Sequence, residues 1–230
     1  ERIPSSTANV TNAIYGIDGS PIVKDIYYDD TPDDGRNNPV WKTIALVGLG
    51  AGGHGYFALD ITNPQSPTHL FAIENDPVNQ AVKHWDKDGF KNEFGYAGGS
   101  IDANMDYRKL GETWSTPRII RMPTSADGRI ETDRYVAVLG AGMAKNDACA
   151  GSAVFLVDLE GHDDGNGPGS IYGSETNGGP IIIVDTSPSG VTAGDEILST
   201  PSGSNISNAL PASPIVITPD TAPNIPWRGA

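Results

Sequence analysis

The chain has 230 residues and carries 29 acidic against 15 basic side chains, which gives a formal net charge of −14. This charge argues against a nucleic-acid backbone or an anionic membrane surface as the partner, because both attract clustered Lys and Arg. The 28 glycines and 18 prolines, with 21 Asp against only 8 Glu, disfavour a helical bundle or a coiled coil. Apolar runs such as the one at 181–184 are far shorter than the ~20 residues of a membrane-spanning helix, so no such span is expected.

The first predicted unit covers about residues 15–74 and contains four short strands. They are expected at 20–28, 42–48, 55–61 and 68–74. Apolar, β-branched and aromatic residues fill these segments, turn residues bound them, and none shows the 3.6-residue period of a helix. A long polar insertion at 75–111 follows, for which we predict no secondary structure.

The second predicted unit covers about residues 112–185 and repeats the same pattern. Its strands are expected at 117–122, 134–140, 153–159 and 180–185. An insertion rich in Gly, Ser and Thr follows at 186–208, and residues 209–230 are predicted to start a third unit.

Matched landmarks identify these units as an internal repeat. A small residue, a proline and an apolar segment recur at Pro21, Pro117 and Pro214, at spacings of 96 and 97 residues. In the first two units a strand ends in Asp60 and Asp158, which lie 39 and 41 residues after the proline. Landmarks in the same order at nearly the same spacing indicate a tandem repeat.

A repeated antiparallel unit of four strands predicts an all-β fold, and more specifically part of a modified β-propeller. Its blades would be four-stranded antiparallel sheets with long inserted loops. One such sheet cannot bury both of its faces, so neighbouring blades must pack on it. Two units and the start of a third are too few to close a ring of about four to eight blades. We therefore expect the remaining blades to lie outside this chain.

The run 48–53 fits the glycine pattern of a dinucleotide-binding loop, G-x-G-x-x-G, and follows a predicted strand. A dinucleotide site needs a helix after the glycines, because the helix N-terminus holds the pyrophosphate. Residues 54–61 have the pattern of a strand that ends shortly before Pro64. The glycines, like Gly140 and Gly142 of the second unit, are therefore predicted to form tight hairpin turns.

The best candidate for a metal site is the loop that contains Asp86, Asp88 and Glu93. Its opening resembles a calcium-binding D-x-D-G loop, and carboxylate oxygens are the hard ligands that calcium prefers. The third Asp and the Glu at loop position 12 are absent, so a solvated turn is the alternative. Calcium is thus the one candidate cofactor, and no catalytic residue is predicted.

The aromatic residues offer a second kind of candidate. Trp41, Trp85, Trp114 and Trp227 are the four tryptophans that could line a ligand surface. Because Trp41 and Trp114 lie beside predicted strands, we expect these two to pack between blades instead. The four histidines are scattered and lack the spacing of a zinc site.

Three runs in the first unit carry a resemblance to a known family. They are residues 15–25 (YGIDGSPIVKD), 41–43 (WKT) and 47–62 (VGLGAGGHGYFALDIT). On these motifs the sequence resembles the PilY/PilC family of type IV pilus biogenesis factors and tip-associated adhesins. The match is strongest over 15–74 and continues more weakly through 115–160 and 211–230. Quinoprotein propellers share part of the pattern, because their blades carry similar Y-A-L-D strands.

The resemblance implies a modified β-propeller in the C-terminal part of a large exported bacterial protein, at the pilus tip, the cell surface or the outer membrane. Such proteins support pilus assembly against retraction and contribute to adhesion and twitching motility. The implied partners are minor pilins or other pilus components, and a host or abiotic surface. Many members carry a calcium loop after an S-P-x-V strand. The comparable position here keeps only Asp220 and Asn224 as oxygen ligands, which argues against calcium regulation there.

Together these observations predict a non-enzymatic propeller module of an exported type IV pilus tip or assembly protein. One alternative is enzymatic: a quinoprotein (PQQ-type) dehydrogenase propeller, which needs Arg and carboxylate ligands around a quinone and a calcium ion. The other alternative is a secreted propeller scaffold that binds carbohydrate.

Overall fold

Seven stretches of the chain are described by the structure, a computed structural model. They are residues 16–28, 40–96, 105–122, 134–143, 150–160, 183–185 and 209–216. The regular elements within them are β-strands that pair antiparallel, which confirms the all-β prediction. None of the described residues belongs to a helix with the length and hydropathy needed to cross a membrane.

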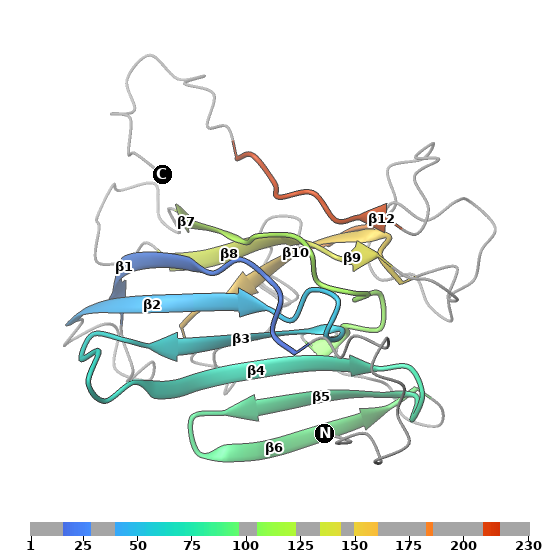
Figure 1. Cartoon of the computed structure of the whole chain (residues 1–230), viewed down its shortest axis with the longest axis horizontal. Coiled ribbons are helices and arrows are strands. Elements are labelled where there is room, and N and C mark those ends of the chain that lie inside the picture. The colour runs from blue at the N-terminus through green and yellow to red at the C-terminus, as the bar shows by residue number, and fades with distance from the viewer. Residues whose placement is uncertain are drawn as a thin grey trace, which may run out of the picture.

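The first sheet is a six-stranded meander in which each strand pairs with its neighbour in the sequence (Figure 1). Its strands are β1 (Ile22–Tyr28), β2 (Val40–Gly48), β3 (Gly55–Asp60), β4 (Thr68–Asp76), β5 (Ala81–Asp86) and β6 (Gly89–Gly95). The four strands predicted for the first unit correspond to β1–β4, with bounds that differ only at their ends.

Strands β5 and β6 lie in the insertion 75–111, so the first sheet is larger than the predicted four-stranded unit. Their hairpin turns at Lys87 and Asp88. Gly89, the first residue of β6, has a φ of +118°, a conformation that glycine adopts without a steric penalty. Polar residues such as Lys83 and Glu93 interrupt the alternation of apolar and polar residues, so hydropathy alone does not mark these strands. Pairing with β4 stabilises them, because cross-strand contacts compensate for a mixed composition.

The second sheet has four strands in the order β11-β10-β8-β7. They are β7 (Arg118–Met122), β8 (Arg134–Gly140), β10 (Ala153–Asp158) and β11 (Ile183–Asp185). All four were predicted for the second unit. A separate ladder joins β9 (Gly142–Met143) to β12 (Ala209–Leu210), which belongs to the predicted third unit.

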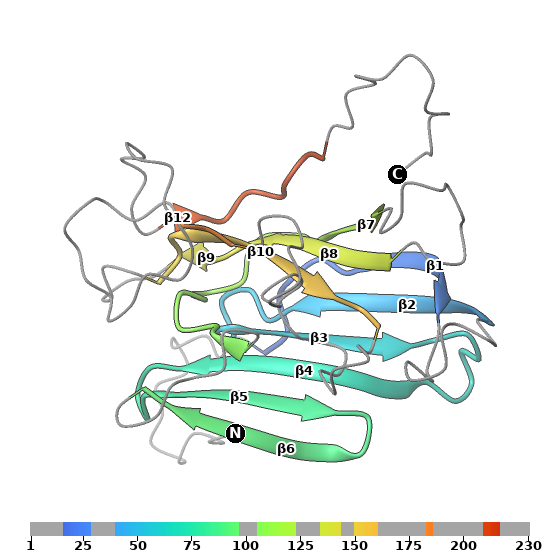
Figure 2. The ribbon, with the colours of Figure 1, turned by 180° about the vertical axis from the view of Figure 1, so that it is seen from behind.

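The hydrophobic core lies between the inner faces of the two sheets. Its buried side chains include Ile44, Leu46, Tyr56, Phe71 and Ile73 from the first sheet and Ile119, Leu139, Phe155 and Val157 from the second. Successive residues of a strand point to opposite faces, so alternate residues of each strand enter this core. The segment 105–110 closes the core, and the ring of Tyr107 lies 5.2 Å from that of Phe155. Figure 2 shows the second sheet beyond β1, at the edge of the first.

The hairpin tip of each unit contacts the segment that leads into the next unit. In the first unit the amide of Gly50 donates a 3.2 Å hydrogen bond to the carbonyl of Thr113, and in the second the tip strand β9 pairs with β12. Both contacts are too close for a side chain. A Cβ on Gly48 would lie 2.6 Å from the Thr113 oxygen, and one on Gly140 would lie 2.2 Å from the Leu210 oxygen. The repeat seen in the sequence is therefore matched in the structure, because both hairpin tips make the same kind of contact with the segment that follows.

Candidate functional site

The glycine turn between β2 and β3 is held by the buried hydroxyl of Thr113. This hydroxyl accepts hydrogen bonds from the amides of Leu49 (2.8 Å) and Gly50 (3.3 Å), and it donates one to the carbonyl of Gly55 (2.8 Å). Strand β3 begins at Gly55, so a strand follows the glycines, as predicted. A strand in this place does not provide the helix N-terminus that a dinucleotide site requires, and the motif is a structural turn.

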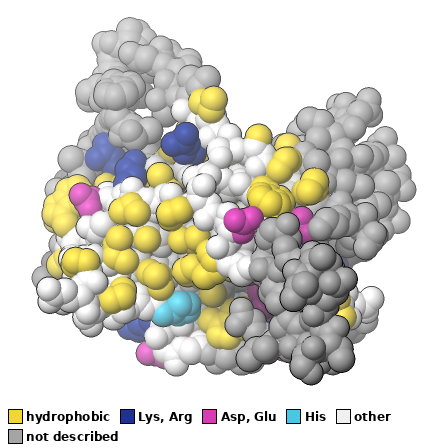
Figure 3. Space-filling view, viewed as in Figure 1, with side chains coloured by type: hydrophobic (Ala, Val, Ile, Leu, Met, Phe, Trp, Pro, Cys, Tyr) yellow, Lys and Arg dark blue, Asp and Glu magenta, His cyan; other side chains and the backbone are white. Residues whose placement is uncertain are grey.

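The face of the first sheet that points away from the core, here called the outer face, is also apolar. Two rows of cross-strand partners cross it: Val23–Ala45–Leu59 and Val47–Phe57–Ala72–Trp85. Figure 3 shows hydrophobic side chains gathered over the centre of this face. A sheet that is apolar on both faces is typical of one covered on both sides, and an exposed apolar patch marks an interaction surface.

An aromatic pair stands at one end of the outer face. Tyr27 and Trp41 are direct cross-strand partners on β1 and β2, with ring centroids 5.2 Å apart and planes inclined by 46°. Trp41 is 62% exposed, so it does not pack into the core between the described sheets. Trp114 is 39% exposed and donates its ring N–H to Glu112. Trp41 is therefore exposed enough to contribute to a ligand surface. Packing of Trp41 and Trp114 between blades stays a prediction.

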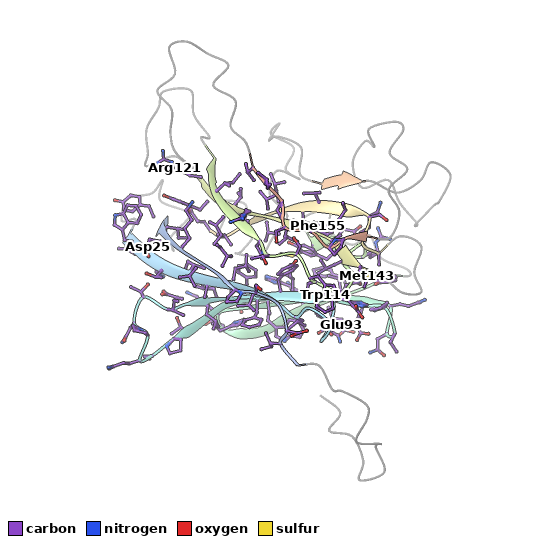
Figure 4. The ribbon with its side chains drawn as sticks, turned by 45° about the horizontal axis from the view of Figure 1, so that its top comes forward. Asp25, Glu93, Trp114, Arg121, Met143 and Phe155 are labelled. Atoms are coloured by element: carbon purple, nitrogen blue, oxygen red, sulfur yellow. The ribbon has the colours of Figure 1, made fainter. Side chains whose placement is uncertain are left out.

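Asp25 and Thr43 form the next rung toward the centre of the face. They are cross-strand partners, and the Thr43 hydroxyl donates a 2.6 Å hydrogen bond to Oδ1 of Asp25. The amide of Thr43 donates to the hydroxyl of Thr62 at 3.0 Å, which ties this rung to the loop after β3. Figure 4 shows Asp25 on β1, on the same side of the molecule as Arg121. An exposed carboxylate with a fixed orientation therefore lies beside the aromatic pair.

Basic side chains mark the junction between the two sheets. Lys24 on β1 donates a 2.9 Å hydrogen bond from Nζ to the carbonyl of Ile119 on β7. Burial lowers the pKa of Lys24 below its usual value, and the charge of Arg121 lowers it further. Figure 3 shows dark blue side chains along this border of the outer face. Lys24 thus joins the two sheets and faces away from the aromatic pair.

The predicted calcium ligands lie on the β5–β6 hairpin. Asp86 ends β5, and its Oδ1 accepts a 2.9 Å hydrogen bond from the amide of Asp88 in the turn. Glu93 lies farther along β6, opposite Lys83. The structure therefore brings Asp86 and Asp88 together and places Glu93 beside a cation. Within the described ranges no group of three or more His, Cys, Asp or Glu residues is arranged to hold a metal ion.

Calcium binding by Asp86, Asp88 and Glu93 stays a prediction. The second implied position, Asp220 and Asn224, lies outside the described residues. Sequence reasoning did not single out Asp25 or Tyr27. The available signal was the alternation in β1, which places Val23, Asp25 and Tyr27 on one face.

Comparison with known proteins finds sequence similarity to a pilus protein. No protein-family model matches it. Among curated proteins, it is 26% identical over 146 residues to the type IV pilus biogenesis factor PilY1 of Pseudomonas aeruginosa (strain UCBPP-PA14). The match covers 64% of this chain and 8% of that protein, so the chain spans a small part of the relative's length. The crystal structure of the Pseudomonas aeruginosa PilY1 C-terminal domain aligns with 70% of this chain and 23% of its own, with a TM-score of 0.34 and 22% identity.

The 146 aligned residues extend well beyond the first unit, where the family motifs are strongest. The chain is thus PilY-like in sequence, as its motifs predicted, and is similar to a protein named as a type IV pilus biogenesis factor.

Proposed function

We propose that the chain is a non-enzymatic module of an exported protein that supports type IV pilus biogenesis. The observation that carries the proposal is the sequence similarity to PilY1. The module acts by protein contact, and its partners are minor pilins or other pilus components. The exposed aromatic end of the outer face offers a surface for such contacts.

We also propose that the two sheets are blades of a modified β-propeller. The repeated contact between each hairpin tip and the next unit supports this arrangement, because it stacks successive units in the same way. A neighbouring blade would cover the rows through Val47 and Phe57 on the outer face. A structure of the full-length protein tests this proposal: solvent over both rows would contradict it.

The proposal also includes a location at the pilus tip or cell surface. There the protein contributes to adhesion to a host or abiotic surface and to twitching motility. Calcium at Asp86, Asp88 and Glu93 is a separate proposal that the pilus function does not require. Its support is the contact between Asp86 and Asp88 in the hairpin turn.

Deletion of the gene in the bacterium that carries it tests the pilus function. The deletion strain is expected to lose surface pili, measured as pilin in the sheared fraction and by electron microscopy, and the intact gene supplied in trans is expected to restore them. Normal piliation in the deletion strain would contradict the proposal. Dye-linked alcohol oxidation by the purified full-length protein with PQQ and calcium would instead support the quinoprotein alternative.

A further inference from the structure

The end of the outer face at Tyr27 and Trp41 combines a stacking platform with polar groups that point to solvent. We propose that this end is a binding site for a neutral pyranoside of a polysaccharide. The site consists of Trp41, Tyr27, Asp25 and Thr43, here called the aromatic rung site. The inference deepens the adhesive part of the proposed function and rests on it for its biological meaning, but it concerns a specific surface and a specific ligand class.

The platform is Trp41. It lies on the exposed side of the sheet with 62% of its surface open to solvent, and the tilted ring of Tyr27 supports it from the neighbouring strand. One face of a pyranose ring presents C–H groups that carry partial positive charge. Such a face packs well on the negative face of an aromatic ring, which gives both apolar contact and an electrostatic preference.

The polar groups around the platform match the hydroxyls of a sugar. The two rings carry hydrogen-bonding groups of their own, the Trp41 ring N–H and the Tyr27 hydroxyl. Asp25 uses Oδ1 to accept from Thr43, which leaves Oδ2 free to accept a sugar hydroxyl. A hydrogen bond to a carboxylate is stronger than one between neutral groups, so Asp25 fixes the orientation of the ring.

The geometry is prepared before a ligand arrives. Cross-strand pairing fixes the spacing of the two rungs, and Thr43 holds the carboxylate at 2.6 Å while its own amide is held by Thr62. A site with few groups to order on binding loses less conformational entropy. The carboxylate also selects for charge: it repels sialic and uronic acids in a chain whose net charge is already −14.

The first experiment measures binding of neutral tetrasaccharides, one β-1,4-linked from glucose and one from N-acetylglucosamine, to the full-length protein by titration calorimetry. At least one should bind, and a sialylated oligosaccharide should not. Trp41→Ala should weaken binding by roughly tenfold, and Asp25→Asn by roughly threefold, as expected for loss of a stacking ring and of a charge-assisted hydrogen bond. Trp41→Phe should retain part of the affinity.

The matched control is Trp114→Ala, which removes another exposed tryptophan outside the aromatic rung site. It should leave binding unchanged, and circular dichroism of every variant should match that of the unaltered protein. Binding that survives Trp41→Ala in a folded protein would overturn the inference. So would absence of binding by both neutral tetrasaccharides, or a preference for the sialylated sugar or for a Lys-rich peptide.

A second readout separates this inference from the pilus proposal. A strain that carries Trp41→Ala should keep normal surface pili and lose adhesion to a polysaccharide-coated surface. If gene deletion abolishes pili but the Trp41→Ala strain adheres normally, the sugar site is rejected and the pilus function is supported. If the protein binds a tetrasaccharide but gene deletion leaves piliation normal, the pilus function is rejected and the sugar site is supported.

Discussion

The hydroxyl of Thr113 donates a 2.8 Å hydrogen bond to the carbonyl of Gly55, across 58 residues of sequence. The same oxygen accepts from the amides of Leu49 and Gly50, so one side chain satisfies both ends of the turn that precedes β3. Thr113 itself belongs to the segment that leads into the second unit. The contact therefore connects two repeats through a polar group that is fully buried.

Thr113→Val should destabilise the protein, because valine has nearly the same shape but lacks the hydroxyl that bonds to the carbonyl of Gly55 and to the amides of Leu49 and Gly50. The two amides keep their backbone acceptors, the carbonyls of Gly55 and Thr113, so the expected loss is that of a buried hydrogen bond, about 1 kcal/mol, measurable as the free energy of unfolding in urea. Thr113→Ser keeps the hydroxyl and should recover most of the loss. The control Thr68→Val changes an exposed threonine and should have little effect. Equal stability of the two valine variants would contradict this role of Thr113.

Gly142→Ala should cost more stability than Gly89→Ala. Both glycines have a positive φ, +86° and +118°, so both substitutions strain the backbone, by about 1–3 kcal/mol. At Gly142 the new Cβ would also lie 1.9 Å from the carbonyl oxygen of Glu112, whereas at Gly89 nothing lies within 4 Å. The difference between the two unfolding free energies measures the close approach of the second hairpin tip to its neighbour. Equal losses would show that the backbone relaxes freely there.

The ion pair between Asp76 and Lys83 should make the stability of the protein depend on pH in the acidic range. The Lys83 ammonium donates a 2.6 Å hydrogen bond to Asp76, and this contact, with bonds from Asn79, holds the pKa of Asp76 at about 2, below its usual 3.8. The folded state therefore releases this proton more readily than the unfolded state. The stabilisation is present above pH 3.8 and is lost as the pH falls toward about 2.

Asp76→Asn and Lys83→Met should each flatten this acid dependence, measured as thermal midpoints between pH 5 and pH 2. The pair should contribute less than about 1 kcal/mol to the free energy of unfolding, because solvent screens an ion pair near the surface. If the variants lose stability as steeply as the unaltered protein when the pH is lowered, other carboxylates must cause the pH dependence.

Tyr56→Phe should destabilise the core by about 1 kcal/mol, since it removes the hydrogen bond from the Tyr56 hydroxyl to the carbonyl of Ser115, 2.9 Å away. Burial raises the pKa of Tyr56 far above its usual 10.0 and outweighs the opposing effect of that hydrogen bond. The stabilisation from the neutral hydroxyl is thus present below pH 10 and is lost at higher pH. Tyr27→Phe removes a tyrosine hydroxyl that is only partly buried and should cost less than Tyr56→Phe. Ultraviolet titration in which Tyr56 ionises before the protein unfolds would contradict the expectation.

Calcium binding at the β5–β6 hairpin predicts heat on titration with calcium and a higher thermal midpoint. Both signals should fall in Asp88→Asn, which removes a carboxylate from the turn beside Asp86. Asp25→Asn, on the outer face, serves as the matched control. Absence of both heat and thermal shift in the unaltered protein would remove calcium from this hairpin.

Local patterns predicted much of the fold. Runs such as Ile44–Gly48 and Ala153–Asp158 combine β-branching with turn residues at their ends, and strand formation follows from those properties. The glycine run before β3 was identified as a turn for the same reason. Strands β5 and β6 were missed because their Lys and Glu residues weaken the alternation, and pairing with β4 stabilises them. The candidate site was missed in part because pairing across β1 and β2 decides which side chains meet.

By itself, the sequence determined the all-β class, the repeat of about 97 residues and the PilY-like character, because composition, strand patterns and motifs are local properties. Only the tertiary structure decided that Thr113 holds a turn 58 residues away and that the first sheet has six strands. It also decided that Trp41 stands in solvent beside Tyr27 and Asp25. Register and exposure arise from contacts between distant segments, and no local pattern of residues specifies them.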